Sequence, residues 1–156
     1  MMTEMELDEI RCYGISARSR DGFVLPDVPP GEEEPPVQMS VRVRIDRSAL
    51  GVRVRTDLLA ADAEVQVDFG ARYSAPKILE YPPALIADFV AEVAVDMIFP
   101  FIREAVADVT RRVGAEPQLL GLQQQPNGEW VGAMAEEVAK LQKVAAREAE
   151  PQPLTT

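Results

Sequence analysis

The stretch VQMSVRVRIDR, residues 37–47, decides the fold class of this chain. Apolar side chains occupy every second position, and mostly polar side chains stand between them. Because successive side chains of an extended strand point to opposite faces, this alternation predicts a strand with one buried and one solvent-facing side. The expected buried set is Val37, Met39, Val41, Val43 and Ile45, and the expected outer set is Gln38, Ser40, Arg42, Arg44 and Asp46.

The same alternation continues in the two segments that follow. After the turn-like SALG, VRVRTDLL places Val52, Val54 and Thr56 inward, and AEVQVDFGARY repeats the pattern over residues 63–73. Three alternating strands with short links predict an antiparallel meander. Residues 7–17 are rich in β-branched and aromatic side chains and predict a further strand, so we expect a four-stranded sheet.

The outer face of this predicted sheet carries charges of both signs. Arginines lie on two strands and carboxylates on the next, namely Arg42, Arg44, Arg53, Arg55, Glu64 and Asp68. Opposite charges on neighbouring strands contribute about 0.2–1 kcal/mol per pair. We interpret the face as a solvated ladder of salt bridges, and a docking face for a partner is the alternative.

A long helix is expected over residues 82–114. Prolines stand at its start, and Arg111, Arg112 and Gly114 form a typical helix end. Its polar stripe is narrow, so its apolar surface should be covered by the sheet on one side and by a second surface on the other. Pro100 lies in the middle and lacks a backbone N–H, which predicts a kink and a free carbonyl at Asp96.

A second helix is expected over residues 129–150, because large apolar side chains recur at intervals of three or four. The expected class is therefore α+β, a four-stranded antiparallel sheet with a long kinked helix and a second C-terminal helix on one side. Residues 1–150 read as one domain and residues 151–156 as a disordered tail.

The composition excludes several functional classes. The chain has 156 residues, a net charge of −10, no histidine and one cysteine. Histidine-based catalysis and a thiolate metal site are therefore excluded, and no glycine-rich nucleotide motif is present. The acidity argues against nucleic-acid partners, and Asp88, Glu92 and Asp96 interrupt the most apolar stretch, which argues against membrane insertion. We expect a protein that is not an enzyme, needs no cofactor or metal, and acts in the cytoplasm.

The segment IFPFIREAVADVTRRVGAEPQLLGL, residues 98–122, resembles the bacterial export chaperone SecB and the broader SecB-like group. The matching positions are Phe99, Pro100, Arg103, Glu104, Gly114, Pro117, Gln118 and Leu119. The resemblance implies a dimer of dimers assembled through the long helices. It places Phe99, Pro100, Phe101, Arg103 and Glu104 at or beside the oligomer interface, and an ordinary surface pair is the alternative for Arg103 and Glu104.

The SecB family binds unfolded polypeptides without ATP, so the resemblance implies a holdase with a client-binding groove. The implied groove comes from the loop after the first strand, the second strand, the loop between the helices, and the last helix. The corresponding residues here are Phe23, Val24, Leu25, Val37, Met39, Val41, Leu119, Leu120, Leu122, Trp130, Met134, Val138 and Leu141. The alternative for each is ordinary core packing, and it stays fully open for Met39 and Val41.

This chain departs from SecB at two points that concern its export partner, the ATPase SecA. SecB ends in a zinc-binding tail with Cys and His, whereas this chain ends in AAREAEPQPLTT. SecB presents an acidic outer sheet face, whereas this chain places arginines there. Both departures leave SecA docking doubtful. A SecB-like chaperone of a toxin–antitoxin system, with an antitoxin as client, is equally compatible, and an oligomeric adaptor for one folded partner is the alternative function.

Overall fold

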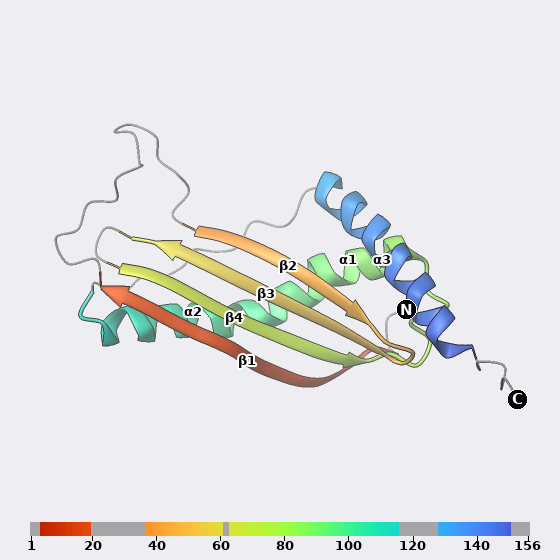
Figure 1. Cartoon of the computed structure of the whole chain (residues 1–156), viewed down its shortest axis with the longest axis horizontal. Coiled ribbons are helices and arrows are strands. Elements are labelled where there is room, and N and C mark those ends of the chain that lie inside the picture. The colour runs from red at the N-terminus through yellow and green to blue at the C-terminus, as the bar shows by residue number, and fades with distance from the viewer. Residues whose placement is uncertain (1–3, 20–36, 61–62, 116–127, 151–156) are drawn as a thin grey trace, which may run out of the picture.

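The computed structural model describes residues 4–19, 37–60, 63–115 and 128–150 of the chain. Its centre is an antiparallel sheet of β1 (Glu6–Ser19), β2 (Val37–Ile45), β3 (Ala49–Leu59) and β4 (Ala63–Ser74). The spatial order is β1-β4-β3-β2, so β1 and β2 form the two edges (Figure 1). The meander expected over residues 37–73 is confirmed, and the first strand pairs with the last.

The alternating pattern of the central strands becomes a buried and an exposed face. In β3, Val52, Val54 and Thr56 are buried, while Arg53 and Arg55 between them are exposed. The predicted inward set of β4 is buried as well and consists of Val65, Val67, Phe69, Ala71 and Tyr73. Period two therefore places the core on one side of the sheet and leaves the other side to solvent.

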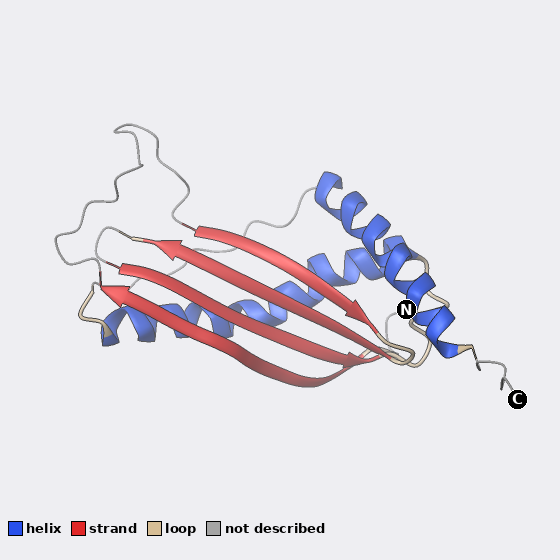
Figure 2. Cartoon of the chain, in the orientation of Figure 1, coloured by secondary structure: helices blue, strands red, loops and turns tan. Residues whose placement is uncertain are grey.

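α2 (Val95–Arg112) lies across the buried face of the sheet and is continuous with α1 (Pro83–Phe89), whereas α3 (Gly128–Ala149) crosses α1 at the β2 edge (Figures 1 and 2). α1 passes through a π-helical turn at Val90–Ala94 into α2. Pro100 lies inside α2, which runs on past it, and a stretch of π-helical geometry precedes α2 at Val90–Ala94. π turns of this kind accommodate one extra residue within a helix and often occur at functional sites. The kink at Pro100 stays a prediction.

α2 ends at the residues that the sequence predicts for a helix end. Gly114 has φ +76°, its N–H donates to the Arg111 carbonyl, and the Ala115 N–H donates to the Thr110 carbonyl. This pair of bonds is a Schellman motif, which uses glycine because a Cβ is unfavourable at positive φ.

α3 packs across α1 and also contacts β2. Gln142 Nε2 donates to the carbonyls of Ile78 and Tyr81 at 2.8 and 2.9 Å, which ties the middle of α3 to the segment before α1. The end of α3 is held at the β2–β3 turn, where Arg47 donates to the Ala149 carbonyl at 2.6 Å. These bonds fix α3 beside the β2 edge of the sheet.

Candidate functional site: the β2 edge and the face of α2

The first candidate surface lies along the β2 edge. Val37, Met39 and Val41 are half-buried and pack against the core, and the alternate residues of β2 are exposed. β3 pairs with one side of β2, and no other described strand pairs with its second side. An unpaired edge offers main-chain donors and acceptors to an extended peptide. The strand thus combines free backbone groups with half-buried apolar side chains.

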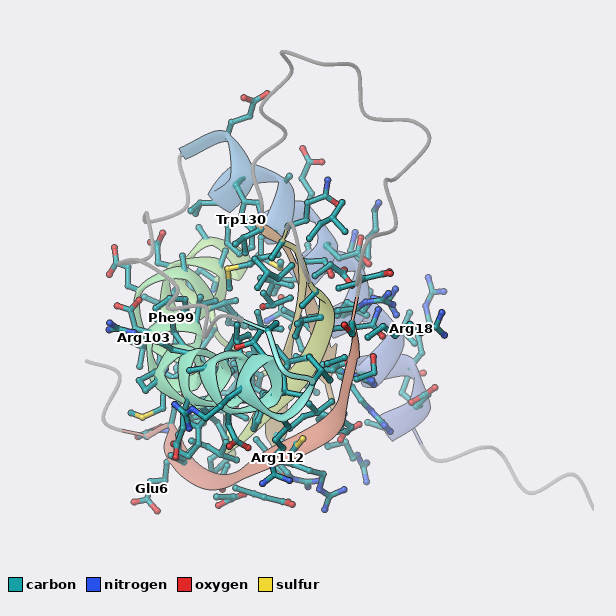
Figure 3. The ribbon with its side chains drawn as sticks, turned by 90° about the vertical axis from the view of Figure 1, so that its left-hand side faces the viewer. Glu6, Arg18, Phe99, Arg103, Arg112 and Trp130 are labelled. Atoms are coloured by element: carbon teal, nitrogen blue, oxygen red, sulfur yellow. The ribbon has the colours of Figure 1, made fainter. Side chains whose placement is uncertain are left out.

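α3 contributes the apolar side chains next to this edge. Trp130, Met134 and Leu141 are half-buried at its margin, and Figure 3 shows Trp130 at the start of α3, on the β2 side of the molecule. Val138 is fully buried, so it has no surface that a client can contact. Its burial favours the alternative of core packing for Val138, and the helical phase that points it at the core leaves its three neighbours at the rim.

Part of the expected groove lies outside the described residues. Phe23, Val24 and Leu25 belong to residues 20–36, and Leu119, Leu120 and Leu122 belong to residues 116–127. The tail 151–156 also lies outside them. These assignments stay predictions.

The second candidate surface is the exposed side of the long helix, which we call the outer side of α2. Val93 in the π-helical turn and Met97 and Phe101 in α2 recur every four residues and are 38%, 42% and 42% exposed, and the Phe101 ring borders the sheet at Phe69. Ile98 and Ile102 are fully buried against the sheet, and Figure 3 shows Phe99 and Arg103 pointing away from it. Pro100, Arg103 and Glu104 are exposed, and Phe99 is half-buried. Neither Arg103 nor Glu104 forms an ion pair with another residue of the described ranges.

Sequence reasoning missed a third apolar surface, on β1. Leu7 and Ile15 are 41% and 47% exposed and stand opposite the inward-facing Tyr73 and Val67, whereas the half-exposed Tyr13 lies over Gly70 on the outer face of the sheet. A hollow of about 360 Å³ between α2 and β4 has Phe69 and Phe101 in its wall, at a ring distance of 6.3 Å. The signal in the sequence is weak, because register shifts at Leu7/Glu9 and Cys12/Gly14 interrupt the period of two along β1.

The outer face of the sheet is not the continuous ladder that we expected. One pair joins two strands, since Arg53 binds Asp68 through two bonds of 2.7 Å. This bidentate bond raises the pKa of Arg53. Arg44 and Arg55 instead pair within their own strands, with Asp46 at 3.5 Å and Asp57 at 3.4 Å. Register sets Arg42 directly opposite Arg53, and it sets Arg55 between Ser40 and Asp68. Asp68 nevertheless binds its diagonal neighbour Arg53, which leaves Arg55 to Asp57.

The described residues offer neither a cluster of metal ligands nor a helix that could span a membrane. No group of three or more cysteine, aspartate or glutamate side chains is arranged to hold a metal ion. No helix of the described chain is long and apolar enough to cross a bilayer.

The fold is shared with a solved SecB-like chaperone of Mycobacterium tuberculosis, in complex with a ChAD peptide from the HigA1 antitoxin. The TM-score is 0.58 at 20% sequence identity, over 81% of this chain and 95% of that one. A Streptococcus agalactiae protein of unknown function matches with a TM-score of 0.54 at 8% identity, over 76% of this chain and 98% of that one. No family model and no curated protein matches the sequence. The chain has a SecB-like α+β fold, as the motif around Pro100 predicted.

Proposed function

We propose that this protein is an ATP-independent holdase, not an enzyme, and that it binds non-native polypeptide segments along the β2 edge. The observation that carries the proposal is the conjunction of an unpaired edge strand with half-buried apolar side chains on both β2 and α3. A client strand gains main-chain hydrogen bonds from β2, and its alternate side chains meet the apolar margin of α3. Met39 and Met134 suit varied clients, because an unbranched thioether side chain repacks easily.

The proposed client is a dedicated polypeptide such as an antitoxin. The peptide in the Mycobacterium tuberculosis neighbour supports this choice, because a segment of an antitoxin is the ligand of that protein. Protein export is the other route open to a SecB-like holdase, and SecA docking is left out of the proposal. The proposed compartment is the cytoplasm, where the single exposed thiol of Cys12 stays reduced.

The protein is proposed to act as a dimer of dimers. The outer side of α2 supports this assembly, since three large apolar side chains in one row are exposed on a single chain. Contiguous exposed apolar surface of this kind marks an interaction site. Phe99, Pro100, Phe101, Arg103 and Glu104 are the residues that we assign to or beside this interface.

Light scattering tests the holdase activity. A chemically unfolded protein is diluted into buffer with near-stoichiometric amounts of this protein and no nucleotide, and the measurement is repeated with a second, unrelated client. We expect aggregation of both clients to be suppressed. Suppression of neither, by a protein that is folded and oligomeric, would favour the adaptor that binds one specific folded partner.

A pair of variants tests the location of the groove. Met39→Asp combined with Trp130→Asp should raise the client's dissociation constant about tenfold or more, because burying two unpaired carboxylates is unfavourable. Val144→Asp is the matched control, since Val144 is exposed on the same helix about 21 Å from Trp130. Equal client capture by the double variant and the native protein would place the groove elsewhere.

A further inference from the structure

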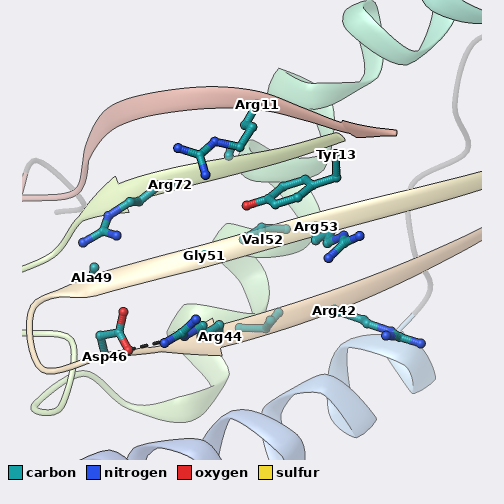
Figure 4. Close-up of a pocket in the computed structure, with 12 residues that line it drawn as sticks. Arg11, Tyr13, Arg42, Arg44, Asp46, Ala49, Gly51, Val52, Arg53 and Arg72 are labelled. Atoms are coloured by element: carbon teal, nitrogen blue, oxygen red, sulfur yellow. Dashed lines mark ion pairs between the residues drawn. The ribbon is translucent and has the colours of Figure 1, made fainter. Parts of the chain in front are cut away.

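The outer face of the sheet carries a basic surface on an otherwise acidic chain. Two adjacent rows cross the four strands there. The register places Arg44, Gly51, Arg72 and Glu9 in one row and Arg42, Arg53, Gly70 and Arg11 in the next. Figure 4 shows the five arginines around the bare backbone at Gly51. We call this surface, lined by Arg11, Arg42, Arg44, Arg53 and Arg72, the arginine hollow.

Gly51 forms the open floor of this surface. The hollow has a volume of about 430 Å³. A Cβ added at Gly51 would meet nothing closer than the Arg44 Cβ at 3.6 Å, so space is open above it. Gly70 is instead covered by Tyr13, whose ring also stacks against Arg53 with the guanidinium 4.2 Å from its centre. One side of the hollow is therefore a wall of Tyr13 and Arg53, the latter bound to Asp68, and its floor is open.

The charges in the hollow are incompletely neutralised. Glu9, Asp46 and Asp68 pair with Arg11, Arg44 and Arg53. Arg42 and Arg72 have no ion pair with any residue that the structure describes. Arg42 stands directly opposite Arg53, and like charges at opposed positions are unfavourable. An anion in the hollow would relieve this repulsion, and it would do so on a chain whose net charge is −10.

We propose that the arginine hollow binds a short acidic segment of a partner polypeptide. Guanidinium groups bind carboxylates through paired hydrogen bonds, and Arg42 and Arg72 have this capacity free. Four strands span about 15 Å, which matches an extended segment of four or five residues. Nucleic acid fits less well, because a long polyanion would be repelled by the acidic remainder of the chain. This surface lies on the opposite face of the sheet from the proposed groove and does not depend on holdase activity.

A labelled peptide tests the proposal directly. The probe is a fluorescein-labelled peptide of six Glu-Ser repeats, and fluorescence anisotropy reports its binding to the native protein. We expect binding at low ionic strength that weakens as salt is added, because exposed charges are screened beyond about 8 Å at physiological ionic strength. The control probes are a Lys-Ser peptide of equal length and a single-stranded DNA of twelve nucleotides. Failure of the acidic peptide to bind, or tighter binding of the DNA, would overturn the proposal.

Two matched double variants locate the binding. Arg42→Glu with Arg72→Glu should weaken peptide binding about tenfold or more. Arg18→Glu with Arg147→Glu changes the net charge equally, at exposed positions that do not line the hollow, and should alter affinity less than about twofold. An equal loss in both would show a general charge effect and refute the site.

The substitution Gly51→Glu tests the same site by placing a carboxylate on the floor of the arginine hollow. The new carboxylate would lie in the row between Arg44 and Arg72 and compete with the peptide. We expect about tenfold weaker binding with an unfolding temperature equal to or above the native one, because strand geometry accepts the side chain without a clash. Gly51→Gln, which adds similar bulk without charge, should weaken binding less. Native affinity in Gly51→Glu would contradict the proposal.

Discussion

At the scale of single residues, the core contains two polar side chains that contribute through packing and not through hydrogen bonds. Thr56 Oγ1 and the Tyr73 hydroxyl are buried and find no hydrogen-bond partner among the described residues. Tyr73 is 2% exposed and its ring meets Phe89 edge-on at 4.9 Å. A buried unpaired polar group costs about 1–3 kcal/mol, whereas a favourable aromatic pair contributes about 0.5–1.5 kcal/mol. We infer that Tyr73 stabilises the fold through its ring.

Tyr73→Phe should therefore change how stability depends on pH. Burial raises the pKa of the Tyr73 phenol above its ordinary value of 10.0. The unfolded chain then releases this proton first, so stability is fully present below about pH 10 and is lost as the pH rises toward the folded pKa. Tyr73→Phe should reduce that alkaline loss and leave neutral stability unchanged or higher, as measured by urea unfolding at about pH 9 and pH 11.

The measurement needs a suitable background. Burial and the hydrogen bond to Glu4 also raise the pKa of Tyr81. The protein with Tyr73 and the Tyr73→Phe variant should therefore both carry the substitution Tyr81→Phe. If the free energy of unfolding falls equally between about pH 9 and pH 11 with and without the Tyr73 hydroxyl, the expectation is contradicted.

At the scale of elements, a bulge in β1 fits the first strand onto the sheet. The register shift between Cys12 and Gly14 inserts Tyr13 as an extra residue, and its ring then lies over Gly70 of β4. Bulges redirect side chains in this way. The residue period of β1 is broken at this point, so the alternation that predicts the faces of β2, β3 and β4 does not predict those of β1.

Gly70→Ala should destabilise the protein by about 1–3 kcal/mol. Its Cβ would meet the Tyr13 Cε2 at 2.6 Å and the Val52 carbonyl oxygen at 3.1 Å. Gly51→Ala is the matched control on the same face, with its nearest contact at 3.6 Å, and should be close to neutral. Tyr13→Ala should restore part of the loss in a double-mutant cycle measured by denaturant unfolding. Equal free energies of unfolding for the two alanine variants would refute this packing account.

At the scale of the whole molecule, the distribution of apolar surface indicates assembly. The outer side of α2 exposes Val93, Met97 and Phe101, and the nearby strand β1 exposes Leu7 and Ile15. A single chain leaves these surfaces in water, whereas a second copy would bury them.

Met97→Glu combined with Phe101→Glu should lower the mass in solution, measured by light scattering coupled to size-exclusion chromatography. Two carboxylates in the centre of an apolar interface weaken association by several kcal/mol. Val144→Glu with Ala146→Glu is the control, because it adds the same charge at exposed positions of α3. An unchanged mass for the α2 variant would move the interface away from this helix.

The sequence by itself determined the α+β class, the meander over residues 37–73 and the end of the long helix. These features depend on neighbours in the chain, through the period of two, the helical period and the glycine that accepts positive φ. It also indicated β2 and α3 as groove-forming elements, through the resemblance around Pro100. These predictions did not require knowledge of which strand lies beside which.

The tertiary structure decided which charged side chains meet on the outer face of the sheet and which side chains of α3 are buried. The first depends on strand register and the second on the rotation of the helix about its axis. Register leaves Arg42 opposite Arg53, sets Gly51 between two arginines and places Asp68 opposite Arg55, from where it binds the diagonal neighbour Arg53. Rotation of α3 against the core buries Val138 and leaves Leu141 at the rim. Strand register and the rotation of α3 are both set by the packing of segments far apart in the chain. For that reason the arginine hollow is visible only in the three-dimensional structure.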